Sequence, residues 1–169
     1  MKNIILIGMP GAGKSTMGVI LAKILGRTFI DTDLLIQEQA KRRLQQIIDT
    51  DGPDAFLELE EKTILSRQFT NAVIATGGSV VYSKKTMEHF KKNGVVVYVK
   101  VSFATMRKRL GNITTRGIVL TGGQTLSGMY HDRIPLYERY ADITIDCSGG
   151  DFEQCVGNVV NELAKLPDA

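Results

Sequence analysis

The chain has 169 residues, of which 43% are hydrophobic and 23% charged, and its formal net charge is +3. This length suffices for one domain with a proper core. Lysines and arginines are mixed with acidic residues instead of forming a basic stripe, which argues against a nucleic-acid partner. No apolar run is long enough to span a membrane, and the first residues lack the pattern of a signal peptide. We therefore expect a cytoplasmic protein with no membrane partner.

The two cysteines, Cys147 and Cys155, form no CxxC pair and have no histidine near them in the sequence. We expect both to be reduced thiols, buried or half-buried, as is usual in the cytosol. His89 and His131 are isolated in the sequence, so no zinc site is expected.

Apolar, β-branched runs alternate with helical patterns along the chain. The runs predict strands at residues 4–7, 28–30, 72–75, 95–101 and 143–145. They show little polar alternation, as expected for strands that are covered on both faces. The helical patterns predict helices at residues 14–25, 83–93, 102–110 and 152–166. This order is typical of an α/β protein, a three-layer αβα fold with a five-stranded parallel sheet.

The segment GMPGAGKST, residues 8–16, follows the first predicted strand and precedes a helix. It matches G-x(4)-G-K-[ST], in which the glycines let backbone N–H groups converge on an anion and the helix start adds its dipole. Lys14 supplies a positive charge for the β- and γ-phosphates, and the hydroxyl of Ser15 can ligate Mg²⁺. The residues expected to bind the nucleotide here are Gly11, Ala12, Gly13, Lys14, Ser15 and Thr16.

Such loops serve many activities, so nucleotide binding alone does not define the function. The chain has little room for the added domains of a motor, and no NKxD-type run is present to read guanine. These features favour a small-molecule kinase over a GTPase switch, with ATP and Mg²⁺ as cofactors.

Two carboxylates end the second predicted strand in the segment FIDTD, residues 29–33. Strand alternation places Asp31 and Asp33 on the same face, at the carboxyl edge of the sheet where ligands bind. We expect Asp31 to lie near the metal, and Asp33 to orient an acceptor hydroxyl or take its proton. The alternative is that one of them, with Asp33 as the candidate, caps the next helix.

Three other segments are candidates for the acceptor side. Gly77 and Gly78 follow the third strand, where they permit close approach of a ligand or only a tight turn. Residues 34–69 form a long, mostly helical insertion. Residues 111–123, GNITTRGIVLTGG, have glycine at both ends and predict a mobile lid or, alternatively, an idle surface loop.

Four segments in this order, GMPGAGKST, FIDTD, ATGGS and DRIPLYERYAD (residues 132–142), resemble the shikimate kinase family over essentially the whole chain. The resemblance implies a small P-loop fold of the nucleoside monophosphate kinase-like group. It implies one domain over residues 1–169, with residues 34–69 as a substrate-binding insertion and 111–123 as the lid. The implied activity is ATP-dependent phosphorylation of shikimate to shikimate 3-phosphate, a step of aromatic amino acid biosynthesis.

On the nucleotide side, the resemblance implies that Lys14 contacts the phosphates and Ser15 the Mg²⁺. Arg116 corresponds to the lid arginine that reaches the transferring phosphate, so Lys14, Asp33 and Arg116 are the expected catalytic residues. Arg109 corresponds to an arginine that packs on the adenine, although Arg107 is only two residues away.

On the acceptor side, the resemblance implies that Asp31 supports the metal and that Asp33 binds the acceptor hydroxyls. Gly77 and Gly78 would offer backbone N–H groups to the substrate. Arg133 would bind the substrate carboxylate.

The sequence departs from the family pattern at three positions. Leu57 replaces an arginine of the family that pairs with the acceptor carboxylate. Ser79 replaces the third glycine of a GGG run, and Gly117 replaces the proline that follows the lid arginine. Loss of one partner from a buried charge pair costs roughly 2–5 kcal/mol, so the change at Leu57 bears directly on the acceptor.

Three outcomes of the leucine remain open. Arg133 holds the carboxylate alone, or another cation replaces the missing one, with Arg42, Arg43 and Arg67 as candidates. Alternatively, the acceptor is another small hydroxylated compound such as a sugar acid. A nucleotide-binding regulator without transfer activity is a further alternative. In each case we expect a monomer that binds small molecules.

Overall fold

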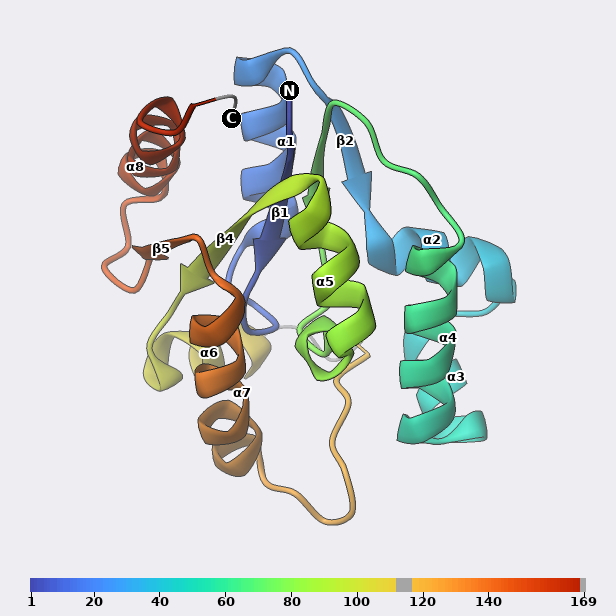
Figure 1. Cartoon of the computed structure of the whole chain (residues 1–169). Coiled ribbons are helices and arrows are strands. Elements are labelled where there is room, and N and C mark those ends of the chain that lie inside the picture. Colours follow the sequence, from blue (N-terminus) through green and yellow to red (C-terminus); the bar gives the residue numbers. More distant parts are fainter. Residues whose placement is uncertain (112–116, 168–169) are drawn as a thin grey trace.

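The computed structural model describes residues 1–111 and 117–167. Its centre is a five-stranded parallel sheet with the strand order β2-β3-β1-β4-β5 (Figure 1). The strands are β1 (Asn3–Ile7), β2 (Thr28–Asp31), β3 (Ala72–Ala75), β4 (Gly94–Lys100) and β5 (Ile143–Asp146). The apolar runs therefore predicted every strand, each to within one residue at either end.

Helices connect the strands and cover both faces of the sheet, which confirms the predicted three-layer fold (Figure 1). The helices between strands include α1 (Lys14–Leu25), α5 (Lys84–Lys92), α6 (Phe103–Gly111) and α7 (Leu126–Tyr140), with a short 3-10 helix η1 (Val80–Tyr82), and α8 (Phe152–Ala164) follows the last strand. The 34–69 region contains α2 (Thr32–Ala40), α3 (Leu44–Asp51) and α4 (Pro53–Leu65). None of the helices that the structure describes is long and apolar enough to cross a membrane.

Alternation along β1 decides which helices lie on which face. Gly18 of α1 packs toward Leu6, so α1 lies on the face to which Leu6 points. Ile7 points to the opposite face, and its register partner in β4 is Tyr98. The ring of Tyr98 stacks on Tyr137 of α7, with centroids 5.1 Å apart. The sheet is therefore covered by α1 on one side and by α7 on the other.

The three helices of the 34–69 region build a second, smaller hydrophobic cluster beside the β2 edge of the sheet (Figure 1). Val119, from the chain segment that leads into α7, is 2% exposed and packs into this cluster. The described end of the predicted lid is therefore in contact with the helical insertion. The buried members of the cluster are Ile36, Leu44, Ile47, Ile48, Phe56 and Val119.

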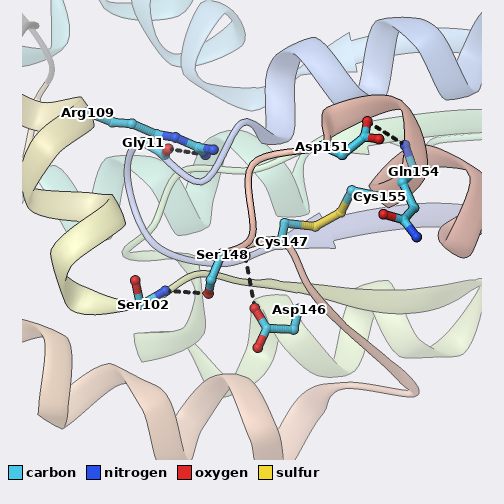
Figure 2. Close-up of a disulfide and its surroundings, with 9 residues drawn as sticks. All are labelled: Gly11, Ser102, Arg109, Asp146, Cys147, Ser148, Asp151, Gln154 and Cys155. Atoms are coloured by element: carbon cyan, nitrogen blue, oxygen red, sulfur yellow. Dashed lines mark hydrogen bonds between the residues drawn. A yellow bond between two sulfur atoms is a disulfide. The ribbon is translucent and has the colours of Figure 1, made fainter.

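The prediction of two reduced thiols was wrong, because the structure joins Cys147 and Cys155 in a disulfide (Figure 2). Cys147 directly follows β5, and Cys155 lies in the first part of α8. Asp151 caps α8 by accepting a hydrogen bond from the backbone N–H of Gln154 at 3.1 Å. This turn brings the chain back on itself, so residues eight apart in sequence have Cα atoms 5.8 Å apart.

We expect reduction of this disulfide to lower the stability of the fold. Closing a loop of this size stabilises a protein by roughly 2–3 kcal/mol in the chain-entropy treatment. For a protein of this length that corresponds to a fall in Tm of roughly 5–10 °C. Calorimetry with and without dithiothreitol measures the change, and the Cys147→Ala/Cys155→Ala double variant, which has no bond to lose, should not respond. An unchanged Tm in the wild type would contradict the disulfide.

Candidate active site

The phosphate-binding loop joins β1 to α1 and opens at the carboxyl edge of the sheet. Gly13 adopts a left-handed conformation, with φ 92°, directly before the first residue of α1. Only glycine adopts this conformation without strain, so the loop can turn its N–H groups inward at the helix start. The conformation of Gly13 is compatible with the predicted anion-binding nest, which stays a prediction.

Lys14 begins α1 and is 7% exposed. Its ammonium donates hydrogen bonds to the backbone carbonyls of Gly8, at 2.7 Å, and Met9, at 2.8 Å. These bonds hold the charge within the loop, on the side that lines the cavity described below. The side chain can exchange carbonyl oxygens for phosphate oxygens without leaving the loop.

Asp31 joins the start of α1 to the start of α2. One of its carboxylate oxygens accepts from the hydroxyl of Ser15 at 2.8 Å. The other accepts from the backbone N–H of Asp33 at 2.9 Å, which makes Asp31 the N-cap of α2. The alternative that one of the two aspartates caps this helix is therefore confirmed for Asp31 and not for Asp33. The placement of Asp33 on the strand was wrong, because Asp33 lies in the first turn of α2.

Both aspartates nevertheless face one cavity of about 300 Å³ at the carboxyl edge of the sheet. The cavity lies between the phosphate-binding loop, the start of α2, the turn after β3 and the helical insertion. Among the predicted site residues, those that line it are Gly13, Lys14, Ser15, Thr16, Asp31, Asp33, Gly77 and Gly78. Its other lining residues are Pro10, Gln37, Leu44, Phe56, Thr76, Ser79 and Gly117.

The oxygen atoms of Ser15 and Asp31 fit a magnesium ion. Mg²⁺ takes oxygen ligands and is usually held by one or two protein groups together with substrate phosphates and water. A hydroxyl and a carboxylate oxygen 2.8 Å apart, beside the phosphate loop, provide such a pair. Within residues 1–111 and 117–167, no cluster of three or more His, Cys, Asp or Glu side chains forms a self-contained metal cage.

Arg133 lies behind the wall of this cavity instead of lining it. The side chain is 1% exposed, donates to the backbone carbonyl of Val119 at 2.7 Å and to the hydroxyl of Tyr82 at 3.3 Å, and lies 5.2 Å from the centre of the Tyr82 ring. One of its terminal nitrogens lies 2.9 Å from the position that a Cβ on Gly78 would take. The guanidinium therefore approaches the cavity at Gly78.

Arg109 is half-buried and contacts the phosphate-binding loop, donating to the carbonyl of Gly11 at 3.1 Å (Figure 2). Arg107, the other candidate for the adenine contact, is exposed. The position of Arg109 is thus the better match to the predicted role, which remains a prediction. Arg116 lies outside the described residues.

The three arginines proposed as replacements for the missing cation do not line the cavity. Arg42 forms an ion pair with Asp51 at 2.5 Å, and Arg67 lies 3.9 Å from Glu38. Arg43 is exposed at the start of α3. Arg42 and Arg67 therefore have other partners, and no contact in the described part of the chain directs any of the three to the acceptor side.

Glu60 is a buried carboxyl of the site to which the sequence assigned no role. It is 3% exposed and accepts a hydrogen bond from the hydroxyl of Ser79 at 2.9 Å. Burial, followed by the nearby charge of Asp33, raises the pKa of Glu60 to about 8, against the opposing effects of Ser79 and Arg133. Its helical spacing with buried residues at positions 56 and 64 was the signal available in the sequence.

The phosphate-binding loop, the two aspartates that face the cavity and the parallel five-stranded sheet together define the class of protein. It is a small P-loop kinase of the nucleoside monophosphate kinase-like fold. The family model described as shikimate kinase matches residues 10–164. A shikimate kinase from Actinobacillus succinogenes is 36% identical, with 99% of this chain and 95% of the relative covered. One from Thermodesulfovibrio yellowstonii is 34% identical, with 98% and 97% covered. The chain belongs to the shikimate kinase family.

Solved structures agree with this assignment. The shikimate kinase from Acinetobacter baumannii in complex with shikimate superposes with a TM-score of 0.85 at 28% identity, covering 99% of this chain and 96% of that one. The shikimate kinase from Aquifex aeolicus gives a TM-score of 0.79 at 27% identity, covering 96% of each chain.

We expect Gly78→Ala to destabilise the protein by about 1–3 kcal/mol, because the new Cβ would overpack the site. It would lie 2.8 Å from the Cδ of Pro10 and 2.9 Å from a terminal nitrogen of Arg133. Urea denaturation measures the change. The control is Gly157→Ala on the exposed face of α8, where no atom lies within 4 Å of the added Cβ. This substitution should be neutral or slightly stabilising. Equal stabilities of the two variants would show that the loop and Arg133 do not meet at Gly78.

Proposed function

We propose that this chain transfers the γ-phosphoryl group of ATP to a hydroxyl of shikimate, giving shikimate 3-phosphate. The observation that carries the proposal is the single cavity in which a phosphate-binding loop faces the carboxylate of Asp33. This arrangement supports direct transfer between two bound molecules, since little covalent chemistry is required of the protein beyond positioning and charge neutralisation. The shikimate kinase from Acinetobacter baumannii, which has the same fold, was solved in complex with shikimate.

On the nucleotide side, the loop N–H groups and the Lys14 ammonium bind the phosphates. Ser15 and Asp31 hold Mg²⁺, directly or through its waters, and the ion when bound neutralises charge on the phosphates. Arg109 packs on the adenine, and Arg116 contacts the transferring phosphate.

On the acceptor side, Asp33 accepts a hydrogen bond from the hydroxyl that is phosphorylated and can take its proton. The backbone N–H groups of Gly77 and Gly78 contact the substrate. Arg133 binds the carboxylate from behind Gly78, which requires the guanidinium to exchange part of its bonding to Val119 or Tyr82 for the substrate.

We also propose that residues 34–69 bind the acceptor and that residues 111–123 form the lid within one domain, 1–169. The contact between the two segments supports this division, because a Cβ on Gly117 would lie 2.6 Å from that of Leu44. A lid that docks on the insertion can exclude water from the phosphate, which protects ATP from hydrolysis. We propose that the protein works as a monomer in the cytoplasm.

Leu57 favours a second candidate function, a kinase for another small hydroxylated acid. Leu57 is half-buried in α4 and lines a small hollow with Glu60, Ser79 and Tyr82. Its side chain offers no charge to a substrate carboxylate, so that carboxylate would depend on Arg133.

Replacing Lys14 with Met should lower kcat at least about a hundredfold, because the charge that stabilises the transferring phosphate is lost. A coupled assay of ADP release with ATP, Mg²⁺ and shikimate measures the rate. Lys23→Met removes an exposed lysine from the same helix and is the matched control. Full turnover by Lys14→Met would refute the phosphate assignment.

The same assay on the wild type tests the acceptor. ADP release only with another hydroxy acid would support the second candidate, and no ADP release with any acceptor would support a regulator.

Replacing Leu57 with Arg should lower the KM for shikimate about tenfold or more, because it adds a cation on the acceptor side. The KM for ATP should change little. Leu65→Arg, which adds the same charge at a position of α4 that is 37% exposed, is the control. An unchanged shikimate KM in Leu57→Arg would mean that the missing arginine does not limit acceptor binding.

A further inference from the structure

Glu60 lies behind the turn that follows β3 and contacts Ser79 of that turn, which lines the acceptor cavity. Ser79 in that turn fixes one of its oxygens through the hydrogen bond of 2.9 Å. Its other oxygen, Oε2, is buried and has no hydrogen-bond partner among the described residues. A carboxyl with one bonded oxygen and one unbonded, buried oxygen is costly to keep ionised.

The carboxyls of Glu60 and Asp33 meet at Gly77. A Cβ on Gly77 would lie 3.0 Å from Oε2 of Glu60 and 2.8 Å from Oδ1 of Asp33. Both oxygens therefore approach the same backbone position from different helices. Asp33 and Gly77 line the acceptor cavity, so charge on Glu60 acts at its wall.

The titratable groups near Glu60 come from α2, α7 and η1. Asp33 faces it from α2 with a negative charge, and Arg133 faces it from α7 with a positive charge. Tyr137, also of α7, is buried and uncharged, since burial raises the pKa of its hydroxyl. Tyr82 of η1 lines the adjoining hollow. Glu60 therefore has a negative charge, Asp33, and a positive charge, Arg133, near it.

The hollow beside Glu60 has a volume of about 140 Å³ and is bounded by Leu57, Tyr82 and Ser83, among others. Ser79 lines both this hollow and the acceptor cavity, and Glu60 lines the hollow.

We propose that Glu60 is a positioning residue that controls the charge of the acceptor site: with its proton it holds Ser79 and the Gly77 turn beside Asp33, and without its proton it repels an acidic acceptor. This inference rests on the proposed function, because it concerns an acceptor that carries a carboxylate. Burial and Asp33 keep the proton on Glu60 at neutral pH, since they raise its pKa to about 8. Ionisation of Glu60 then places a second negative charge next to Asp33, and this charge is offset in part by Arg133.

The test is the pH dependence of steady-state kinetics with shikimate and ATP in the wild type, Glu60→Gln and Glu61→Gln. If only the protonated form binds the acid, the shikimate KM of the wild type rises about tenfold between pH 7 and pH 9, while the ATP KM and kcat do not follow. Glu60→Gln keeps an acceptor oxygen for Ser79 and loses this rise. Glu61→Gln, the neighbouring carboxyl, retains it. A flat wild-type profile, or an equal rise in Glu60→Gln, overturns the proposal.

Ser79→Ala provides a second variant if Glu60→Gln does not fold. The hydroxyl of Ser79 stabilises the ionised carboxyl, so its loss should move the rise in KM to higher pH. An unmoved midpoint counts against the proposal.

Failure of the proposed function gives a different result. If no shikimate is phosphorylated at pH 7, that function is refuted, and a carboxyl-carbon NMR titration of the free protein then decides the inference. A carboxyl that titrates near pH 8 in the wild type and is absent from Glu60→Gln supports it. No such carboxyl in the wild type overturns it.

Discussion

The carboxylate of Asp31 joins the nucleotide and acceptor sides of the site. All five strands are parallel, so their carboxyl ends meet at one edge of the sheet. Asp31 ends β2 at that edge, where it bonds Ser15 in the first turn of α1 and the N–H of Asp33 in the first turn of α2. Two helix N-termini therefore converge on one carboxylate, and their dipoles favour negative charge in the same place. The proposed phosphate and acceptor sites share this boundary.

Most of the fold could be predicted from the sequence because its signals are local. The five strands are short apolar runs buried on both faces, and they stand out from the helical segments by composition alone. The helix at residues 14–25 begins after a glycine and ends at Gly26, so both of its ends were visible. The phosphate loop was equally clear, since its chemistry depends on consecutive residues.

The features that could not be predicted depend on contacts between segments. Strand alternation was the wrong rule for Asp33, because α2 begins one residue before it. Cys147 and Cys155 are brought together by the turn between β5 and α8, and their spacing in the sequence matches no CxxC motif. The acceptor role of Arg133 stays a prediction, and no sequence pattern indicated that its guanidinium is buried against Val119 and Tyr82.

The two departures at Leu57 and Ser79 are separate in the sequence and act on the same carboxyl in the structure. Without an arginine at position 57, an ionised Glu60 would be a buried charge next to Asp33 that Arg133 offsets in part. A serine in place of glycine supplies a hydrogen bond, and retention of the proton removes the charge. The hydrogen bond and the proton both lower the cost of burying the carboxyl without an arginine at position 57. We therefore expect the charge of the acceptor site to depend on the proton of Glu60 as well as on Asp33 and Arg133.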